Sequence, residues 1–170
     1  MFSWLTILCL CVGCLFFLPG CGKGKKEPSF PTVPDFTLKT LDGGEIVLSR
    51  LKEKVILLDF WATWCRPCRE AIPHLIRLYK NYQKEGLEVI GMNMDRGNLD
   101  AVRHFVKSME IPYPVALAPE NMEKSYGVSG LPTTILIDKK GRIREKIVGF
   151  TNEISKQMTG RVLDLLSEKP

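Results

Sequence analysis

Cys65 and Cys68, in the run Cys-Arg-Pro-Cys, are the side chains of this sequence best suited to chemistry. Of the six cysteines in the chain, the other four lie within the first 21 residues, so the pair stands alone in the remainder. A disulfide that closes so small a loop barely constrains an unfolded chain, so a structural role explains the pair poorly. The spacing instead predicts thiol–disulfide redox chemistry or metal binding.

The chain around the pair favours redox chemistry. Residues 55–60 form a short, mostly apolar run that suits a buried strand, and apolar residues recur at helical spacing after Cys68. A cysteine at a helix N-terminus meets free backbone N–H groups and the positive end of the helix dipole, and both favour the thiolate. Pro67 suits the first helical turn because its missing N–H is not needed there, and Arg66 adds a positive charge. Cys68, one turn later, is then close enough to attack a mixed disulfide on Cys65.

Zinc is the competing use of such a pair, and it would need two further ligands. The chain has two histidines, His74 and His104, which we expect to lie on different helices and to be partly exposed. No second cysteine pair follows residue 22. We therefore expect no metal, and no bound cofactor either, since two sulfurs can hold both electrons.

Hydrophobic periodicity predicts alternating strands and helices. The predicted strands are two short ones within residues 36–48, then 55–60, 87–93, 114–117, 134–138 and 143–148, and the predicted helices are one that follows Cys68 and ends at Gly86, then 100–109, 120–126 and 153–166. Thr151 and Asn152 are candidate caps of the last helix. Strand–helix–strand units imply a parallel central sheet, to which the late hairpin adds antiparallel edge strands. The fold class is therefore α/β, a mixed central sheet flanked by helices.

The N-terminal residues predict attachment to a membrane. Residues 1–22 are expected to be a leader, residues 23–32 a short tether, and residues 33–168 one domain. Three interpretations of the leader stay open. Leu-Pro-Gly-Cys at 18–21 resembles a bacterial lipobox, which would lipidate Cys21. An uncleaved anchor is the second, since the uncharged residues 2–22 would span roughly 32 Å as a helix. The third is an inverted anchor, because the lysines that follow would prefer the cytoplasmic side.

The charge distribution argues against nucleic acid as a partner. The net charge is +5, and lysines and arginines are scattered among acids without an aromatic-interleaved basic run. We therefore expect a solvated surface of mixed charge and no nucleic-acid binding.

The residues around the cysteine pair are similar to those of a known family. Residues 59–68, Asp-Phe-Trp-Ala-Thr-Trp-Cys-Arg-Pro-Cys, resemble the thioredoxin active-site segment, and Pro73 and the run Gly-Leu-Pro-Thr-Thr at 130–134 match further landmarks. The hairpin, the added helix at 100–109 and the leader resemble the membrane-anchored TlpA/ResA-like branch. The resemblance covers about residues 33–168. It implies a thioredoxin fold with an N-terminal β-hairpin extension and an inserted helix.

The resemblance implies roles for individual positions. Cys65 matches the exposed attacking cysteine and Cys68 the buried resolving one, while Asp59 matches the buried acid that exchanges the proton of the resolving thiol. Pro132 matches a proline that follows a cis bond and holds the preceding residue against the sulfurs. Trp61 matches an aromatic residue that shapes the rim of the site. The expected substrate-binding residues are Trp64, Arg66, Pro67 and Leu131.

Two positions depart from the family pattern. The cytochrome-maturation branch commonly has a glutamate three residues after the second cysteine, where this chain has Ala71. Glu70, one place earlier, would point roughly 100° away around the helix. Gly91 stands where thioredoxin has the lysine that partners the buried aspartate. We therefore expect Asp59 to lack a cationic partner and to have a pKa raised by desolvation.

The function that the resemblance implies is that of a thiol–disulfide oxidoreductase that reduces disulfides of proteins outside the cytoplasm, with apocytochrome c in cytochrome c maturation as a candidate substrate. A membrane electron carrier of the CcdA or DsbD type would re-reduce the pair, and the protein is expected to be a monomer. The direction of electron flow stays open. Pro67 and Asp59 are typical of reductases, whereas Arg66 favours an oxidant.

Two other functions compete with this one. Peroxiredoxins share the fold and carry a Pro-x-x-x-Thr-x-x-Cys pattern. In this chain Leu58 and Ala62 occupy the proline and threonine positions relative to Cys65. A non-catalytic thioredoxin-like binding module would not need the intact cysteine pair. The sequence therefore favours the oxidoreductase.

Overall fold

The structure, a computed structural model, describes residues 31–169. The predicted leader, most of the tether and the lipidation candidate Cys21 lie outside these residues. The helices and strands in chain order are β1 (Thr37–Lys39), β2 (Glu45–Val47), β3 (Val55–Trp61), α1 (Arg66–Tyr82), β4 (Leu87–Asn93), α2 (Leu99–Ser108), β5 (Val115–Leu117), α3 (Met122–Tyr126), β6 (Thr133–Ile137), β7 (Ile143–Val148) and α4 (Asn152–Ser167), with short 3-10 turns at Leu48–Arg50 and Gln83–Glu85.

The central sheet is mixed and has the strand order β5-β4-β3-β6-β7, while β1 and β2 form a separate antiparallel pair. β4 runs parallel to both β3 and β5, and β6 runs antiparallel to β3 and β7. This arrangement confirms the predicted α/β class with a mixed sheet. The expectation that both strands of the late hairpin lie at the edge was wrong for β6. β6 lies between β3 and β7, and all five of its residues are buried, as is typical of an interior strand.

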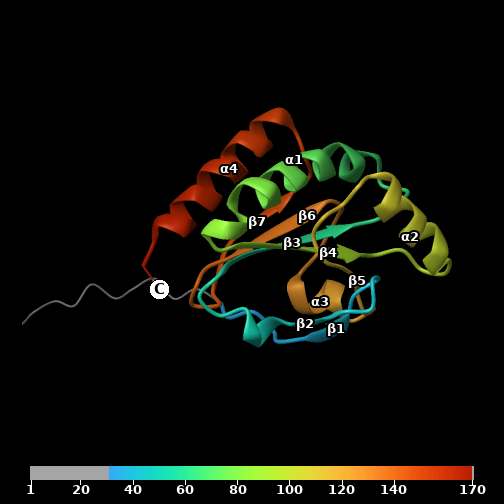
Figure 1. The fold of residues 1–170 in the computed structure, drawn as a ribbon, viewed down its shortest axis with the longest axis horizontal. Helices are drawn as coiled ribbons and strands as arrows, with labels where there is room; N and C mark the ends of the chain where they lie inside the picture. Colours follow the sequence, from blue (N-terminus) through green and yellow to red (C-terminus); the bar gives the residue numbers. More distant parts are fainter. Residues whose placement is uncertain (1–30, 170) are drawn as a thin grey trace, which may run out of the picture.

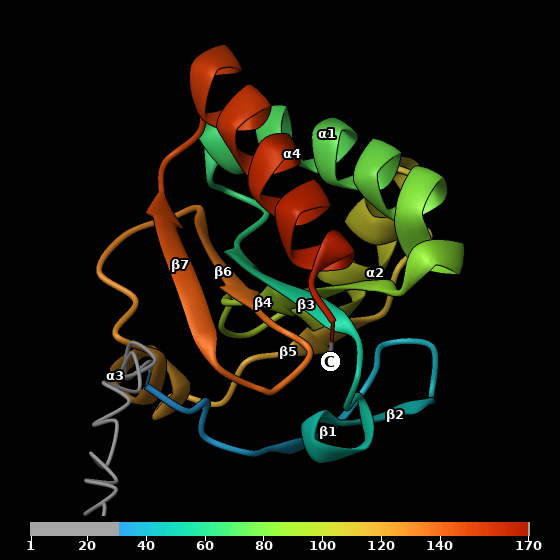
Figure 2. The same ribbon diagram turned by 90° about the vertical axis from the view of Figure 1, so that its left-hand side faces the viewer.

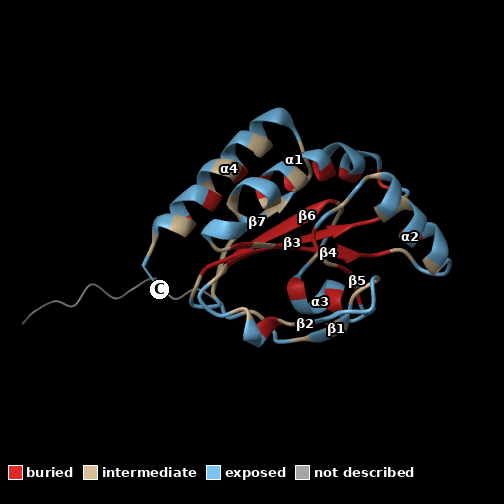
Figure 3. Cartoon of the chain, viewed as in Figure 1, coloured by how far each residue is buried: buried red, intermediate tan, exposed pale blue. Residues whose placement is uncertain are grey.

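β3 is the strand that positions the cysteine pair. All seven of its residues are buried between β4 and β6, which fits its mostly apolar sequence. β3 ends at Trp61 and α1 begins at Arg66, so residues 62–65 form the loop that leads from the sheet centre into the helix. Figure 3 shows the buried residues gathered along the central strands and on the inward sides of the helices.

Helices cover one face of the sheet and the N-terminal hairpin lies on the other. α1 and α4 lie side by side above the sheet in both ribbon views, whereas α3 and the β1–β2 pair lie below it (Figures 1 and 2). Of the two candidate caps of the last helix, Thr151 is confirmed, because the Ile154 N–H donates to its hydroxyl at 3.2 Å, whereas Asn152 is the first residue of α4. Within residues 31–169, no helix has both the length and the apolar character needed to cross a bilayer.

The first described residues join the end of the sheet that lies away from the cysteine loop. The Ile143 N–H donates to the Pro31 carbonyl at 3.0 Å, and the Val33 N–H donates to the Gly141 carbonyl at 3.4 Å. Gly141 belongs to the turn between β6 and β7, and β6 ends beside the start of β3. Residue 31 therefore lies near the start of β3, whereas the loop 62–65 follows the end of that strand.

Candidate active site

Cys65 and Cys68 are joined by a disulfide at the start of α1, with their Cα atoms 5.3 Å apart. Cys65 is the N-cap residue of the helix, and its sulfur accepts a hydrogen bond from the Cys68 N–H at 3.3 Å. Pro67 lies in the first turn, as predicted. The expectation that Cys65 is exposed was wrong for the disulfide form, because its exposed fraction is 5%, close to the 1% of Cys68. The sequence placed the pair correctly at a helix N-terminus, where free N–H groups favour a thiolate.

A shallow groove of about 570 Å³ runs beside the disulfide. Cys65 lines this groove and Cys68 does not, so only the first cysteine faces an incoming molecule. The peptide bond between Leu131 and Pro132 is cis, as the resemblance implied, and Leu131 also lines the groove. The other lining residues are Trp64, Arg66, Pro67, Met94, Glu123, Val128, Ser129 and Gly130.

The four residues expected to bind substrate are thus brought together in this groove. Trp64 is its most prominent apolar feature, because 69% of that residue is exposed to solvent. Met94 and Glu123, which sequence reasoning missed, come from the segment after β4 and from α3. Neither residue stands near the cysteine pair in the chain, so only the fold could bring them to it.

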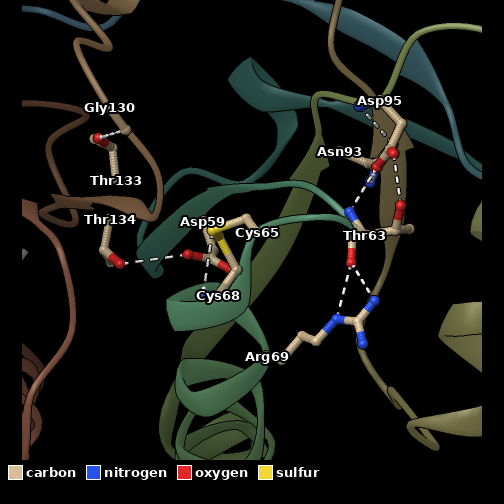
Figure 4. Close-up of a disulfide and its surroundings, with 10 residues drawn as sticks. All are labelled: Asp59, Thr63, Cys65, Cys68, Arg69, Asn93, Asp95, Gly130, Thr133 and Thr134. Atoms are coloured by element: carbon tan, nitrogen blue, oxygen red, sulfur yellow. Dashed lines mark hydrogen bonds between the residues drawn. A yellow bond between two sulfur atoms is a disulfide. The ribbon is translucent and has the colours of Figure 1, made fainter.

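The loop that carries the cysteines is held from two sides (Figure 4). Asp95 accepts two hydrogen bonds from Thr63, one from its N–H at 2.8 Å and one from its hydroxyl at 2.6 Å. The Asn93 side-chain amide donates to Asp95 as well, at 2.8 Å. On the other side, the Arg69 guanidinium donates to the Thr63 carbonyl at 2.9 and 2.6 Å and stacks over the Phe105 ring at 5.3 Å. Residues from β4, α1 and α2 therefore fix the position of the loop.

Asp59 lies in the middle of β3 and is fully buried. In Figure 4 its carboxyl group points toward the start of α1, where Cys68 lies. The Thr134 hydroxyl donates to its Oδ1 atom at 3.4 Å. Burial raises the pKa of Asp59 to about 7, and the hydrogen bond from Thr134 opposes this shift. The structure agrees with the predicted direction and cause.

Position 91, on the strand next to Asp59, holds a glycine. Gly91 is the β4 partner of Asp59, so residue 91 lies directly beside the carboxyl group and brings no charge to it. A Cβ atom on Gly91 would lie 3.0 Å from the Trp61 indole nitrogen and 3.4 Å from the Tyr113 ring. It would also lie 3.1 Å from the Val115 Cγ2 atom, so Trp61, Val115 and Tyr113 together occupy the space that a side chain at position 91 would fill. The expectation that Trp61 shapes the rim was wrong, because the residue is fully buried and packs against Phe105.

The two charged residues near the start of α1 are exposed. Arg66 pairs with Glu70 at 3.5 Å, and 92% of the Arg66 side chain is exposed. Ala71 is 3% exposed and faces the core. A glutamate at position 71 would therefore be buried, whereas Glu70 points into solvent and cannot take its place.

The histidines do not form a metal site with the cysteines. No group of three or more metal-ligating side chains occurs within residues 31–169. His74 packs against the Phe150 ring and is 8% exposed, so the expectation that it is partly exposed was wrong. His104 is exposed on α2, a different helix, as expected.

Comparison with known proteins gives concordant results. A family described as the AhpC/TSA family matches residues 31–146. A curated protein of Bacillus cereus named Thiol-disulfide oxidoreductase ResA is 37% identical over 146 residues, which cover 85% of this chain and 84% of that protein.

Solved structures show the same likeness. A protein of Chlorobium tepidum, provisionally assigned as the thiol:disulfide interchange protein DsbE, superposes with a TM-score of 0.76 at 32% identity and covers 81% of this chain and 97% of its own. A secreted thiol-disulfide isomerase from Corynebacterium glutamicum has a TM-score of 0.72 at 29% identity, with coverage of 80% and 86%. Each likeness therefore extends over most of the described domain.

Proposed function

Because the chain belongs to the AhpC/TSA family of thioredoxin-fold proteins and is a thiol–disulfide oxidoreductase, we propose that it works as a reductase of protein disulfides outside the cytoplasm. The observation that supports this proposal most directly is the position of Cys65. It is the N-cap of α1, it lines the groove, and it is bonded to a cysteine that does not. One sulfur is thus placed to meet a substrate and the other to resolve the product.

The proposed reaction moves two electrons from the dithiol to the substrate. The Cys65 thiolate attacks one sulfur of the substrate disulfide, which forms a mixed disulfide and releases the first substrate thiolate. Cys68 then loses its proton and attacks the Cys65 sulfur, which forms the disulfide seen here and releases the second substrate thiolate. The two substrate thiolates take up protons, so the enzyme is oxidised and the substrate is reduced.

Asp59 is proposed to accept the proton of Cys68. A base near neutral pH suits this step, since efficient proton transfer needs a pKa close to the working pH, and burial raises the pKa of Asp59 to about 7. Leu131 and Pro132 are proposed to hold the substrate backbone against the sulfurs. Trp64, Arg66 and Pro67 would contact the residues that flank the substrate cysteine.

The cellular setting is part of the proposal. Residues 1–22 would direct the chain to a membrane, either through lipidation of Cys21 or as an anchor, and would place residues 33–168 outside the cytoplasm. A membrane electron carrier of the CcdA or DsbD type would return the pair to the dithiol. Apocytochrome c is a candidate substrate, although Ala71 departs from the cytochrome-maturation pattern. The domain would act as a monomer.

Trapping of the mixed disulfide tests the proposal and identifies the substrate. A Cys68→Ala variant lacks the resolving thiol, so it should accumulate disulfide-linked complexes with substrate proteins, which non-reducing electrophoresis separates and mass spectrometry identifies. A Cys65→Ser variant is the matched control and should form none. Equal capture by both variants, or function in cells that survives Cys65→Ser, would support a non-catalytic binding module instead.

The reduction potential of the pair tests the direction of electron flow. A potential of roughly −230 to −280 mV at pH 7, measured against dithiothreitol or glutathione, would fit a reductase. A potential near roughly −120 mV would fit an oxidant that installs disulfides, and the proposed direction would then be wrong.

A further inference from the structure

Three buried polar atoms in the neighbourhood of Gly91 lack hydrogen-bond partners within residues 31–169. They are the Asp59 Oδ2 atom, the Trp61 indole nitrogen and the Tyr113 hydroxyl. Asp59 and Trp61 are fully buried and Tyr113 is 3% exposed. Buried polar groups without partners are rare and call for an explanation, because each loses its hydrogen bonds to water.

The backbone register places Asp59, Trp61 and position 91 on one face of the sheet. Residues 59 and 61 of β3 point to the same side because side chains alternate along a strand. Gly91 pairs with Asp59, so a Cβ atom on Gly91 would stand beside the Asp59 side chain. That position lies 3.0 Å from the Trp61 indole nitrogen and 3.4 Å from the Tyr113 ring. Trp61 and Tyr113 therefore border the space that a side chain at position 91 would fill, together with Val115, whose Cγ2 atom would be 3.1 Å away.

The chemistry of the three groups is complementary. An indole N–H can only donate, a phenol can donate or accept, and a carboxylate accepts only. Asp59 is also close enough to act on Tyr113, because burial, together with the Asp59 charge, raises the pKa of the Tyr113 hydroxyl. Figure 4 also shows the Cys65–Cys68 disulfide beside Asp59, and the Thr134 hydroxyl on β6 donates to its carboxyl group.

We propose that Tyr113, together with Trp61, is a positioning residue that donates a hydrogen bond to the Asp59 carboxylate whenever that group is charged. The proposal rests on the proposed role of Asp59 in accepting the proton of Cys68. When Asp59 ionises, its charge draws the Tyr113 hydroxyl, which has no other partner within residues 31–169, into a hydrogen bond that the hydroxyl donates. These uncharged donors stabilise the carboxylate in place of the cation that a lysine at position 91 would provide.

A direct titration of Asp59 tests the proposal. The oxidised protein is labelled with 13C at aspartate carboxyl groups, and the chemical shift of Asp59 is followed from about pH 4 to about pH 10, so no substrate is needed. Tyr113→Phe removes one oxygen and keeps the ring. Donors to a charged group lower its pKa, so this variant should raise the pKa of Asp59 by about one unit. Trp61→Phe keeps an aromatic ring against Phe105 and should shift the pKa in the same direction.

Tyr79→Phe is the matched control. The Tyr79 ring contacts the Tyr113 ring with centroids 6.0 Å apart, but its hydroxyl is near Glu88 and Lys54 rather than Asp59. It should leave the Asp59 titration unchanged. An unchanged pKa of Asp59 in both Tyr113→Phe and Trp61→Phe, or an equal shift in Tyr79→Phe, would overturn the proposal.

The pH profile of the resolving step gives a second readout. In Tyr113→Phe the rate of Cys68 attack should rise at a pH about one unit higher than in the parent protein. A protein that reduces no substrate would contradict the proposed function but would leave the Asp59 titration valid. An unshifted titration in an active enzyme would contradict only the role of Tyr113.

Discussion

Asp95 receives two hydrogen bonds from Thr63, one from the backbone N–H at 2.8 Å and one from the hydroxyl at 2.6 Å. Thr63 follows β3 by two residues and Asp95 follows β4 by two residues. Because the two strands are parallel, their ends meet at one edge of the sheet, and the carboxylate fixes the loop that leads to Cys65. The loop is thereby tied to the neighbouring strand rather than to its own helix alone.

The loss of this carboxylate should loosen the cysteine loop. We expect Asp95→Ala to lower the free energy of unfolding by about 2 kcal/mol, since it removes the acceptor of several charge-assisted hydrogen bonds, and to slow disulfide exchange. Urea denaturation and an insulin-reduction assay measure both. Asp100→Ala removes only an exposed ion pair with Arg103 and should cost less than about 1 kcal/mol. Equal losses in the two variants would contradict the role of Asp95.

Asp59 should make stability depend on pH. Its pKa is higher in the folded protein, about 7, than its ordinary value of 3.8, so the folded state holds the proton more tightly. The free energy of unfolding should therefore fall as pH rises from about 4 to about 7, by roughly 4 kcal/mol at most. Asp59→Asn should abolish this fall, and it should slow disulfide exchange.

The measurement is urea denaturation of the oxidised protein, in which the cysteines do not titrate. Asp100→Asn, at an exposed site on α2, is the control and should keep the fall in stability. If Asp59→Asn kept the same decline between about pH 4 and about pH 7, the buried carboxyl would not be its source.

Trp64 should act on substrate binding without stabilising the fold. The residue is 69% exposed beside Cys65, so Trp64→Ala should change the free energy of unfolding by less than about 0.5 kcal/mol. It should raise KM for a protein disulfide about tenfold, as expected when a contact worth about 1.4 kcal/mol is lost. Leu163→Ala alters a residue that is 41% exposed on α4 and does not line the groove, so it should leave KM unchanged.

Peroxide should be a poor substrate. The places of the proline and threonine in the peroxiredoxin pattern hold Leu58 and Ala62, both fully buried and apolar, so no hydroxyl is available there to hold a peroxide oxygen. Consumption of hydrogen peroxide by the reduced protein should be no faster than with an equal concentration of free dithiol. Saturable, faster consumption that disappears in Cys65→Ser would reveal a peroxidase.

The sequence predicted the parts of the site that local patterns encode. The apolar run of β3, the helix after Cys68 and the glycine at position 91 all lie where the sequence placed them. The raised pKa of Asp59 was also predictable, because an acid inside an apolar strand is desolvated and Gly91 offers it no cation.

The errors came from contacts between segments distant in the chain. His74 is buried because Phe150 packs against it, and nothing near His74 in the sequence indicates that ring. Trp61 turns into the core because Gly91 leaves room for its indole group. Tyr113 precedes β5 in an irregular segment, so no periodicity indicated its burial. The Thr63–Asp95 bond, in contrast, could have been inferred from two parallel strands that end at the same edge.

The attachment of residue 31 beside the β6–β7 turn has a consequence for electron supply. β3 separates that attachment from the cysteine loop by roughly 20 Å. If residues 1–22 hold the chain at a membrane as proposed, the disulfide faces away from the bilayer, toward soluble partners. An electron donor within the bilayer could then reach the disulfide only after the domain rotates toward the membrane. Reduction of substrate and re-reduction of the disulfide by the donor would each need a different orientation of the domain. The length of residues 23–30 would set how quickly the domain alternates between the two.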